Sequence, residues 1–431
     1  MSDSFIHDAL AMLITLLVCG YVVVAVYRLL TRTRPDLKIG TAVGAAMGLR
    51  ILAVVALPFT GIERTLRGGD ELTFLGHAGE TASSAFGSGA WLDSLTGSLY
   101  EFIFAAQIRL FDSTEATLRL PQLTIAVLGL LLLAVAVYEL AGPRAALIAM
   151  WLMAIEPTNI FFSTYLHKEP NMILASGMVV FGGTMIWKHA ELRWLGLITA
   201  GCLVGVATRP YASWFLIAAG AAILLHAGLR QGKKGNVRGL ALVSVVILLG
   251  AITAPTVLDA TTEENLEANI QGSQNANVAD AEANLSLEQV DFSTRGAIVT
   301  NLHRRVFDVL AKPYPWQTAN TSQTLGAIGA LITLAVLYLL GRELWRSRGS
   351  VMARAGPLIY VGASLLVAYS LSAGNAGTAF RYRTHILVLA ICALVSLKYL
   401  REAAARSAGE HAEAEPDEDL SPTVPPLVPA A

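Results

Sequence analysis

Two adjacent carboxylates, Asp70 and Glu71, are the residues of this chain whose type and position best suit catalysis. They follow a hydrophobic segment that ends near Thr60, within the stretch 68–74 (Gly-Gly-Asp-Glu-Leu-Thr-Phe). Charged side chains close to membrane hydrocarbon are costly, and those that occur tend to face cavities used for chemistry or transport. A carboxylate in such a place can act as a general base toward a hydroxyl group. A solvated pair of loop charges is the alternative interpretation.

Helical spacing would place a further titratable group beside the first carboxylate. If residues 70–80 form a helix, Asp70, Phe74 and His77 share one face, because they are spaced i, i+4 and i+7. Glu71 would then lie about 100° around the helix axis from Asp70, so the two carboxylates cannot serve one hydroxyl equally. We therefore predict a catalytic pair in which Asp70 is the base and Glu71 positions the acceptor or adjusts the local field.

Cations suited to a phosphate group recur where hydrophobic segments meet short connections. Arginine presents a planar fork of donors that fits phosphate oxygens, and positioned cations stabilise a departing phosphate. Any one of these residues also fits an interfacial anchor, because long basic side chains snorkel at helix ends. The predicted phosphate clamp consists of Lys168, Arg209, Arg381 and Arg383. The predicted supporting residues are His77, Arg119, His167 and Glu169.

The composition indicates that membrane helices must position these groups. The chain is 54% hydrophobic and 15% charged, and its mean hydropathy is +0.56, far from the values of soluble globular domains. A net charge of −1 gives no indication of nucleic-acid binding. The apolar stretch 9–30 has no basic region before it and no small-x-small cleavage site after it, which favours a retained anchor over a signal peptide.

The cysteines and histidines predict no metal site of a known motif. Cys19, Cys202 and Cys392 all lie in apolar segments, as expected of small core residues. Neither Cys-x-x-Cys nor His-Glu-x-x-His spacing occurs in the sequence. We expect no certain cofactor, although the acidic residues leave room for a divalent cation.

About eleven apolar segments approach the roughly 20 residues needed to cross the hydrocarbon of a bilayer. They are 8–30, 41–60, 118–140, 144–163, 170–187, 194–208, 211–228, 238–257, 323–341, 355–373 and 383–400. The predicted fold is therefore an all-α polytopic membrane domain covering 1–400, followed by a disordered cytoplasmic tail at 401–431.

The basic connections predict the orientation of this domain. Arg and Lys cluster near residues 32–38, 230–238, 342–354 and 398–406. With eleven spans these four clusters fall on one side, which the positive-inside rule assigns to the cytoplasm. The protein would be a multi-pass protein of the cell membrane with its N-terminus outside and its C-terminus inside.

With eleven spans and the basic clusters in the cytoplasm, three connections are predicted to lie outside, at 61–117, 258–322 and 374–382. In the first, apolar residues from Leu95 to Leu110 recur at helical spacing, which is typical of an amphipathic helix lying in the membrane interface. The second is the one large outer loop, and its Pro-Tyr-Pro-Trp stretch should lie at the interface. We predict that this loop covers the outer cavity and helps to select the acceptor.

These features together suit transfer of a sugar from a lipid phosphate to a hydroxyl, and here the chain resembles a known superfamily. It is similar to the GT-C glycosyltransferases, which use polyprenol-phosphate donors and include protein O-mannosyltransferases and the lipid A aminoarabinose transferase. The stretches that carry the likeness are 69–71, 109–121 leading into 123–140, 155–169, 209–211 and 381–383.

The resemblance implies a GT-C-like fold and roles for four residues. Asp70 matches the catalytic base of the family, and Glu71 matches the second acid seen in the O-mannosyltransferases. Lys168 and Glu169 match a charged site that shapes the phosphate or metal region in some members. The implied partners are a polyprenyl-phosphate sugar and an acceptor that is a glycan, a lipid or a protein. The extra first span, 8–30, and the lack of a large soluble C-terminal domain depart from the family pattern.

Two other functions fit part of the sequence. A polysaccharide polymerase of the O-antigen type would explain a large outer loop that contains arginines, such as Arg295, Arg304 and Arg305. It leaves the acidic pair after an early span unexplained. A transporter or flippase for lipid-linked sugars would favour broken helices and charges at mid-membrane depth, whereas the predicted charges cluster at one surface.

Overall fold

The computed structural model describes most of the chain. The described residues are 3–60, 68–97, 99–111, 113–233, 262–272, 285–347 and 351–414, with a few positions between 239 and 259. Within these ranges every regular element is a helix, and an isolated bridge between Ser286 and Asn375 is the one β-type contact. The all-α prediction is therefore confirmed.

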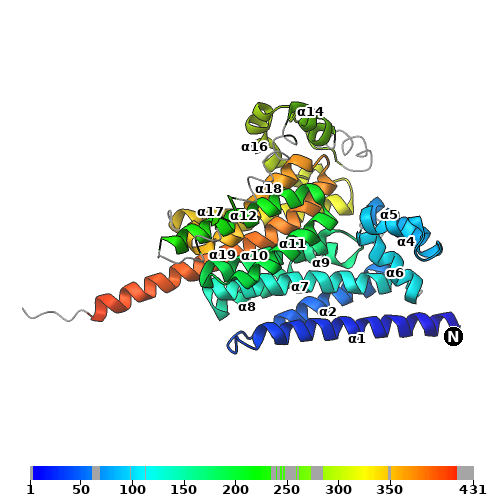
Figure 1. Ribbon diagram of the computed structural model, residues 1–431, viewed down its shortest axis with the longest axis horizontal. Coiled ribbons are helices and arrows are strands. Elements are labelled where there is room, and N and C mark those ends of the chain that lie inside the picture. The colour runs from blue at the N-terminus through cyan, green and yellow to red at the C-terminus, as the bar shows by residue number, and fades with distance from the viewer. Residues whose placement is uncertain are drawn as a thin grey trace, which may run out of the picture.

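The helices form an elongated bundle that also contains a side unit of shorter helices, and α1 runs along one edge (Figure 1). The elements are α1 (Asp3–Thr31), α2 (Gly40–Ala56), η1 (Leu57–Thr60), α4 (Gly68–Ser83), α5 (Gly89–Gly97), α6 (Leu99–Phe111), α7 (Glu115–Ala141), α8 (Pro143–Ile155), α9 (Pro157–Thr164), α10 (Glu169–His189), η2 (Leu192–Trp194), α11 (Leu195–Thr208), α12 (Pro210–Gly232), α14 (Glu263–Leu266), η3 (Glu267–Gln271), α16 (Arg295–Ala311), η5 (Pro315–Gln317), α17 (Thr321–Ser347), α18 (Val351–Ser372) and α19 (Ala376–Ala414).

Seven helices in the described ranges are long and apolar enough to cross a membrane, which makes the chain an all-α, multi-pass membrane protein. They cover His7–Thr31, Gly40–Phe59, Glu115–Ala141, Glu169–His189, Pro210–Gly232, Thr321–Ser347 and Met352–Ser372. The pair α8 and α9, bent by 60°, would be an eighth span.

The predicted count of eleven spans is not confirmed. The predicted span 238–257 lies largely outside the described residues. The predicted span 194–208 corresponds to a shorter apolar helix, Leu192–Thr208. The predicted span 383–400 lies inside the long helix α19.

The core sits around α7 and α10, whose backbones approach closely. A Cβ atom added at Gly129 would meet the Leu174 backbone nitrogen at 2.7 Å, and one added at Gly177 would meet the Gly129 carbonyl oxygen at 2.7 Å. Small residues at such a crossing let membrane helices pack with their backbones in contact. The apolar stretch of α10 is accordingly 83% buried, compared with 11% for α1 at the edge of the bundle.

Long-range contacts define two ends of the bundle. At one end Arg34 Nε donates to Glu139 Oε1 (2.7 Å), Trp187 Nε1 donates to the Ala353 carbonyl (3.4 Å) and Arg401 binds Glu343. We call this the basic-loop end, because the clusters near 32–38, 342–354 and 398–406 lie at or beside it. The opposite end holds the predicted site residues and is called the buried-pair end. Which end faces the cytoplasm stays a prediction.

The first predicted outer connection folds into the unit of α4, α5 and α6 near the start of α7 (Figure 1). Aromatic contacts hold it together, with Phe74 against Tyr100 (5.2 Å between ring centroids) and Trp91 against Phe102 (5.7 Å). Leu166, from the connection between α9 and α10, joins the same apolar cluster. The predicted amphipathic helix corresponds mainly to α6, and α5 precedes it as a separate helix.

Two predicted loop boundaries differ from the structure. The predicted connection 374–382 is much shorter, because α19 already begins at Ala376, where Asn375 Oδ1 accepts from the Thr378 backbone nitrogen (2.8 Å) as an N-cap. The tail predicted to be disordered from 401 instead continues α19 to Ala414. Its Ala, Glu and Arg residues are strong helix formers, which explains the extension. Residues 415–431 lie outside the described residues.

Candidate functional site

Glu71 and Arg119 form a buried ion pair that joins α4 to α7. Arg119 Nε donates to Glu71 Oε1 (3.1 Å), and Glu71 Oε1 also accepts from the Leu166 backbone nitrogen (3.2 Å). Both side chains are almost fully enclosed, and the Arg119 guanidinium lies over the Tyr165 ring, 4.8 Å from its centroid. The pair therefore fixes the start of α4 against the connection 165–168, which carries His167 and Lys168.

The predicted base Asp70 lies in the first turn of α4, directly before Glu71. Residues 70–80 lie within α4, which meets the condition for the i, i+4 and i+7 spacing of Asp70, Phe74 and His77. The Asp70 side chain itself lies outside the described residues. His77 Nδ1 is 3.3 Å from Glu101 Oε2 on the half-exposed surface of this unit.

Lys168 and His167 lie on the connection that Glu71 holds. Lys168 Nζ is 5.0 Å from the centroid of the Phe74 ring, so its ammonium group contacts α4, the helix that contains the acidic pair. His167 is buried, with its ring 5.7 Å from the Phe162 ring. The structure thus brings two predicted cationic positions next to α4.

A second buried ion pair lies at the same end of the bundle. Glu169 opens α10, and Arg209 occupies the short junction between α11 and α12. Arg209 Nη2 donates to Glu169 Oε1 (2.5 Å), and the two side chains are 8% and 1% exposed. Burial alone would lower the pKa of Arg209, but the adjacent Glu169 carboxylate raises it well above its ordinary value. Arg209 therefore stays charged at every physiological pH.

Aromatic residues of α12, α18 and α19 surround this second pair. The Arg209 guanidinium lies 4.6 Å from the centroid of Tyr382, which stacks on Tyr369 at 4.5 Å. The hydroxyl groups of Tyr211 and Tyr382 are hydrogen-bonded to each other. His385 Nε2 is 3.2 Å from the Glu169 carbonyl oxygen. We call these six side chains, those of Glu169, Arg209, Tyr211, Tyr369, Tyr382 and His385, the polar cluster.

The polar cluster keeps unused hydrogen-bonding capacity. Glu169 Oε2 is buried and has no hydrogen-bond partner among the described residues. Leaving a buried carboxylate oxygen unsatisfied costs free energy, so native structures usually fill such positions with a ligand, a water molecule or an ion. A buried carboxylate oxygen can accept a hydrogen bond from a ligand, and an arginine can pair with an anion.

The remaining predicted cations, Arg381 and Arg383, have different surroundings although they are two residues apart. Arg383 is buried and donates to the carbonyls of Leu310 (3.0 Å), Lys312 (2.9 Å) and Gly326 (2.9 Å). Its donors hold the end of α16 and the start of α17 against α19. Arg381 is half-buried and contributes positive charge near Glu169. Arg381 thus acts on the polar cluster through its charge, whereas the contacts of Arg383 are structural.

A third polar group, which the sequence did not predict, stabilises the bend between α8 and α9. Glu156 caps α9 by accepting from the backbone nitrogens of Thr158 (3.0 Å) and Asn159 (2.6 Å). Arg50, fully buried on α2, donates to Ser163 Oγ (2.8 Å) and to Asn159 Oδ1. This bend directs the chain toward Tyr165 and the connection that carries Lys168.

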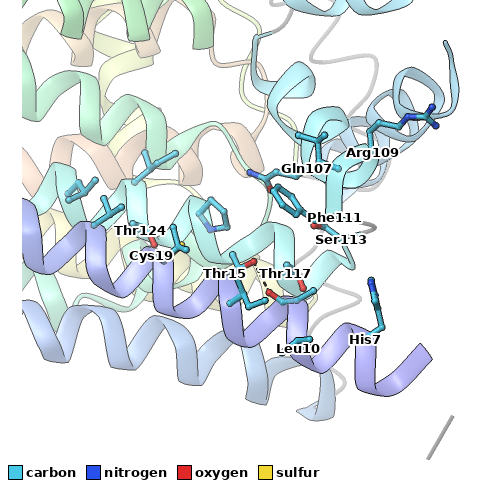
Figure 2. A pocket seen from close by; sticks show the side chains of 18 residues that line it. His7, Leu10, Thr15, Cys19, Gln107, Arg109, Phe111, Ser113, Thr117 and Thr124 are labelled. Carbon is cyan, nitrogen blue, oxygen red and sulfur yellow. Dashed lines mark hydrogen bonds between the residues drawn. The ribbon is translucent and has the colours of Figure 1, made fainter. Parts of the chain in front are cut away.

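A cavity apart from these ion pairs lies beside α1. It has a volume of about 700 Å³ and runs between α1, α6 and α7. Figure 2 shows His7, Gln107, Arg109 and Ser113 toward one end of it and Cys19 toward the other. Among the described residues no group of three or more His, Cys, Asp or Glu side chains is arranged to hold a metal ion.

Comparisons with protein-family models, with curated proteins and with solved structures find no match to this chain.

The sequence signals for the site were uneven. Tyr211 lies in the motif 209–211 and Tyr382 in the motif 380–385, both of which were singled out for their arginines. His385 is the last residue of the second motif. Tyr369 had no signal, because a lone tyrosine in an apolar span resembles many core residues. Only the packing of α18 against α19 places it in the polar cluster.

Proposed function

We propose that this protein is a membrane glycosyltransferase that moves a sugar from a polyprenyl-phosphate lipid to an acceptor hydroxyl. The observation that carries the proposal is the buried pair of Glu169 and Arg209, in which Glu169 Oε2 has no hydrogen-bond partner among the described residues and the Arg209 guanidinium lies over the Tyr382 ring. Buried ionisable residues at the ends of membrane spans are costly, and such residues tend to mark functional sites.

In this proposal the bond between the anomeric carbon and the phosphate oxygen breaks, and the acceptor oxygen takes its place. The polyprenyl phosphate leaves with an added negative charge, which Arg209, Lys168 and Arg381 are suited to stabilise. Glu169 Oε2 would accept from a sugar hydroxyl. These cations would supply most of the stabilisation of the departing phosphate, because they are held in place before the reaction begins.

The acceptor proton is assigned to Asp70. An aspartate has an ordinary pKa of about 3.9, so it must take the proton as the new bond forms rather than beforehand. Glu71 is assigned a positioning role, because its carboxylate is already bound by Arg119 and by the Leu166 backbone nitrogen. Those contacts hold the first turn of α4 next to the connection that carries Lys168.

The predicted outer loop 258–322 is assigned to acceptor selection. The Leu287 nitrogen donates to the Gly374 carbonyl (3.1 Å), and the Ala376 nitrogen donates to the Leu285 carbonyl (2.8 Å). These bonds attach the predicted large outer loop to the start of α19, close to Arg381. Excising 261–287 should then change acceptor use and leave binding of the donor lipid intact.

The proposal is tested by measuring transfer of a labelled sugar from polyprenyl-phosphate donors by the protein in lipid nanodiscs. Asp70→Asn keeps the shape of the side chain and should abolish transfer at saturating donor, whereas donor binding should persist. Arg381→Gln and Lys168→Gln should weaken donor binding, and Arg193→Gln, an exposed cation, serves as the matched control. Unchanged donor binding in both site variants, or normal turnover by Asp70→Asn, would refute the proposal.

The same preparation separates the alternative functions. A polymerase would extend a lipid-linked glycan by whole repeat units and give a ladder of products. A flippase would move the lipid-linked sugar across the bilayer without any change in its covalent structure. A single sugar added to the acceptor is the outcome that the proposal requires.

A further inference from the structure

The helix α16, which belongs to the predicted outer loop 258–322, lies against the ends of candidate spans (Figure 1). Ile298 and Leu302 of α16 pack against one apolar cluster together with Phe215 of α12 and Val367 of α18. Phe215 and Val367 each lie five residues inside the end of their helix, or about 7.5 Å at 1.5 Å per residue. The middle of α16 therefore lies beside these spans rather than beyond their ends.

The end of α16 is held at a similar level. The Arg383 guanidinium donates to the carbonyl of Leu310 in the last turn of α16 (3.0 Å) and to the carbonyl of Gly326 (2.9 Å). Gly326 lies five residues inside the start of α17, another candidate span. One side chain thus ties the end of α16 to a position within a span, so the second half of α16 runs along the bundle.

The face of α16 that points away from the bundle contains large apolar side chains. Val299 is 79% exposed and Phe307 is 55% exposed, and the exposed His303 lies between them. These three residues are spaced four apart and share one face of the helix. The exposed Arg295 and Arg304 are about 40° around the axis from Val299 and about 60° from Phe307, respectively. Apolar residues flanked by cations are typical of a helix that lies in a membrane interface.

Aromatic residues at the same end of the bundle mark the depth of the interface. Trp316 is 79% exposed and stacks on Tyr314 with 5.0 Å between the ring centroids, five residues before α17 begins. Trp214 is 55% exposed in the second turn of α12. Tryptophan and tyrosine are enriched where bilayer hydrocarbon meets water. These positions place the interface at the level of α16.

We propose that α16 is an interfacial helix whose partner is the bilayer itself, with Val299, His303 and Phe307 in contact with lipid at the boundary between headgroups and acyl chains. The contact would hold the predicted outer loop 258–322 at the bilayer surface, next to the ends of α12 and α18. A soluble protein is a poorer partner, because this face lies beside the spans, where lipid surrounds the bundle. The contact does not depend on the proposed transfer reaction.

The apolar side chains, and not the charges, are assigned the binding. Asp308, the one acid of α16, is buried and pairs with Lys312 (3.1 Å). Glu288 and Asp291 are exposed just before α16, and residues 273–284, which contain two further acids, lie outside the described residues. Cations and acids thus stand near the same helix, so a bilayer of zwitterionic phosphatidylcholine is sufficient for the contact.

The test uses the full-length protein in phosphatidylcholine nanodiscs, with its three cysteines replaced by alanine. A nitroxide spin label is attached at Val299→Cys and, in a separate protein, at Phe307→Cys. Leu331→Cys on the candidate span α17 has the same exposure as Phe307 and is the lipid reference. Ser407→Cys is the water reference, because it is exposed on the part of α19 that projects beyond the bundle (Figure 1). Power saturation measures how often each label collides with oxygen, which concentrates in hydrocarbon, and with a water-soluble nickel chelate.

The ratio of oxygen to chelate collisions at Val299 and Phe307 should exceed that at Ser407 several-fold. It should stay below the ratio at Leu331, because the interface is shallower than the middle of a span. A ratio at both sites equal to that at Ser407 would show that this face lies in water and would overturn the proposal. Few collisions with either reagent would show that protein covers the face, which would also overturn it.

Discussion

At the basic-loop end of the bundle the two ion pairs of Glu343 each keep one partner near solvent, although Arg34 and Glu139 at that end are only 9% and 12% exposed. At the buried-pair end the pairs of Arg119 with Glu71 and of Arg209 with Glu169 are enclosed on both sides. Arg401 and Arg346, which bind Glu343, are 34% and 45% exposed. In the pair of Arg119 and Glu71 the exposures are 3% and 0%, and both pairs at that end join helices far apart in sequence. The same residue types therefore serve two different purposes in one molecule.

The difference is informative because burial of charge is costly. Exposed pairs contribute little to stability, and basic residues near membrane surfaces mainly determine which way a chain inserts. A buried pair loses the hydration of both ions, and apolar side chains of similar volume would often hold the helices equally well. The buried-pair end thus has a composition that packing alone does not require, which supports its use for a ligand.

The largest effect is expected from Arg209→Gln, which leaves the Glu169 carboxylate buried without its partner. Breaking a buried pair in this way should lower the free energy of unfolding by about 3–5 kcal/mol, visible as a lower midpoint of thermal unfolding in detergent. The double variant with Glu169→Gln removes the stranded charge and should recover much of that stability. It should still lack transfer activity, since the proposed ligand contacts are gone. A single variant as stable as the wild type would remove the contrast between the two ends.

A smaller effect is expected from Glu71→Gln. The amide keeps one acceptor for Arg119 and for the Leu166 nitrogen, so the loss should be about 1–3 kcal/mol. If Glu71 acts by positioning α4, turnover should fall while the affinity for the donor lipid stays near normal. Glu101→Gln removes an acid from the half-exposed surface of the same unit and is the control. Equal turnover by the two variants would contradict the positioning role.

Two arginines of α19 allow a local test. Arg383→Gln removes charged donors from the carbonyls at the end of α16, so amide exchange near 309–312 should rise on the order of tenfold. Arg381→Gln should leave that exchange unchanged and should instead weaken donor binding. Hydrogen exchange followed by mass spectrometry measures the first effect. If both variants gave the same exchange pattern, Arg381 and Arg383 would have the same role.

The smallest effect is expected at the basic-loop end. Arg401→Gln breaks a pair whose cation is exposed, and the thermal midpoint should not change measurably. Transfer activity should also be unaffected, because this residue lies at the far end of the bundle from the polar cluster. A loss of stability comparable to that of Arg209→Gln would show that the two ends do not differ in the way described.

Several features of the fold could be predicted from local sequence. Runs of apolar residues predicted membrane helices, because every backbone polar group in hydrocarbon must be paired within its own segment. The helix that contains Asp70 was only a condition in the sequence analysis, and the structure supplies it as α4. Beyond residue 401 the sequence analysis predicts disorder, whereas the structure has a helix to Ala414. The Ala and Glu content of that stretch favours a helix.

By itself the sequence determined that the chain is helical, that it enters a membrane several times, and that charged residues stand at the ends of its spans. Only the tertiary structure decided which charges meet: Arg119 with Glu71, 48 residues apart, and Arg209 with Glu169, 40 residues apart. In the tertiary structure Arg383 donates to backbone carbonyls, whereas the charge of Arg381 acts on Glu169 of the polar cluster. The reason is geometric, because each residue adds about 100° of rotation along a helix. The partner of a side chain therefore depends on how each helix is turned against its neighbours, and a chain of separate apolar segments does not encode that rotation locally.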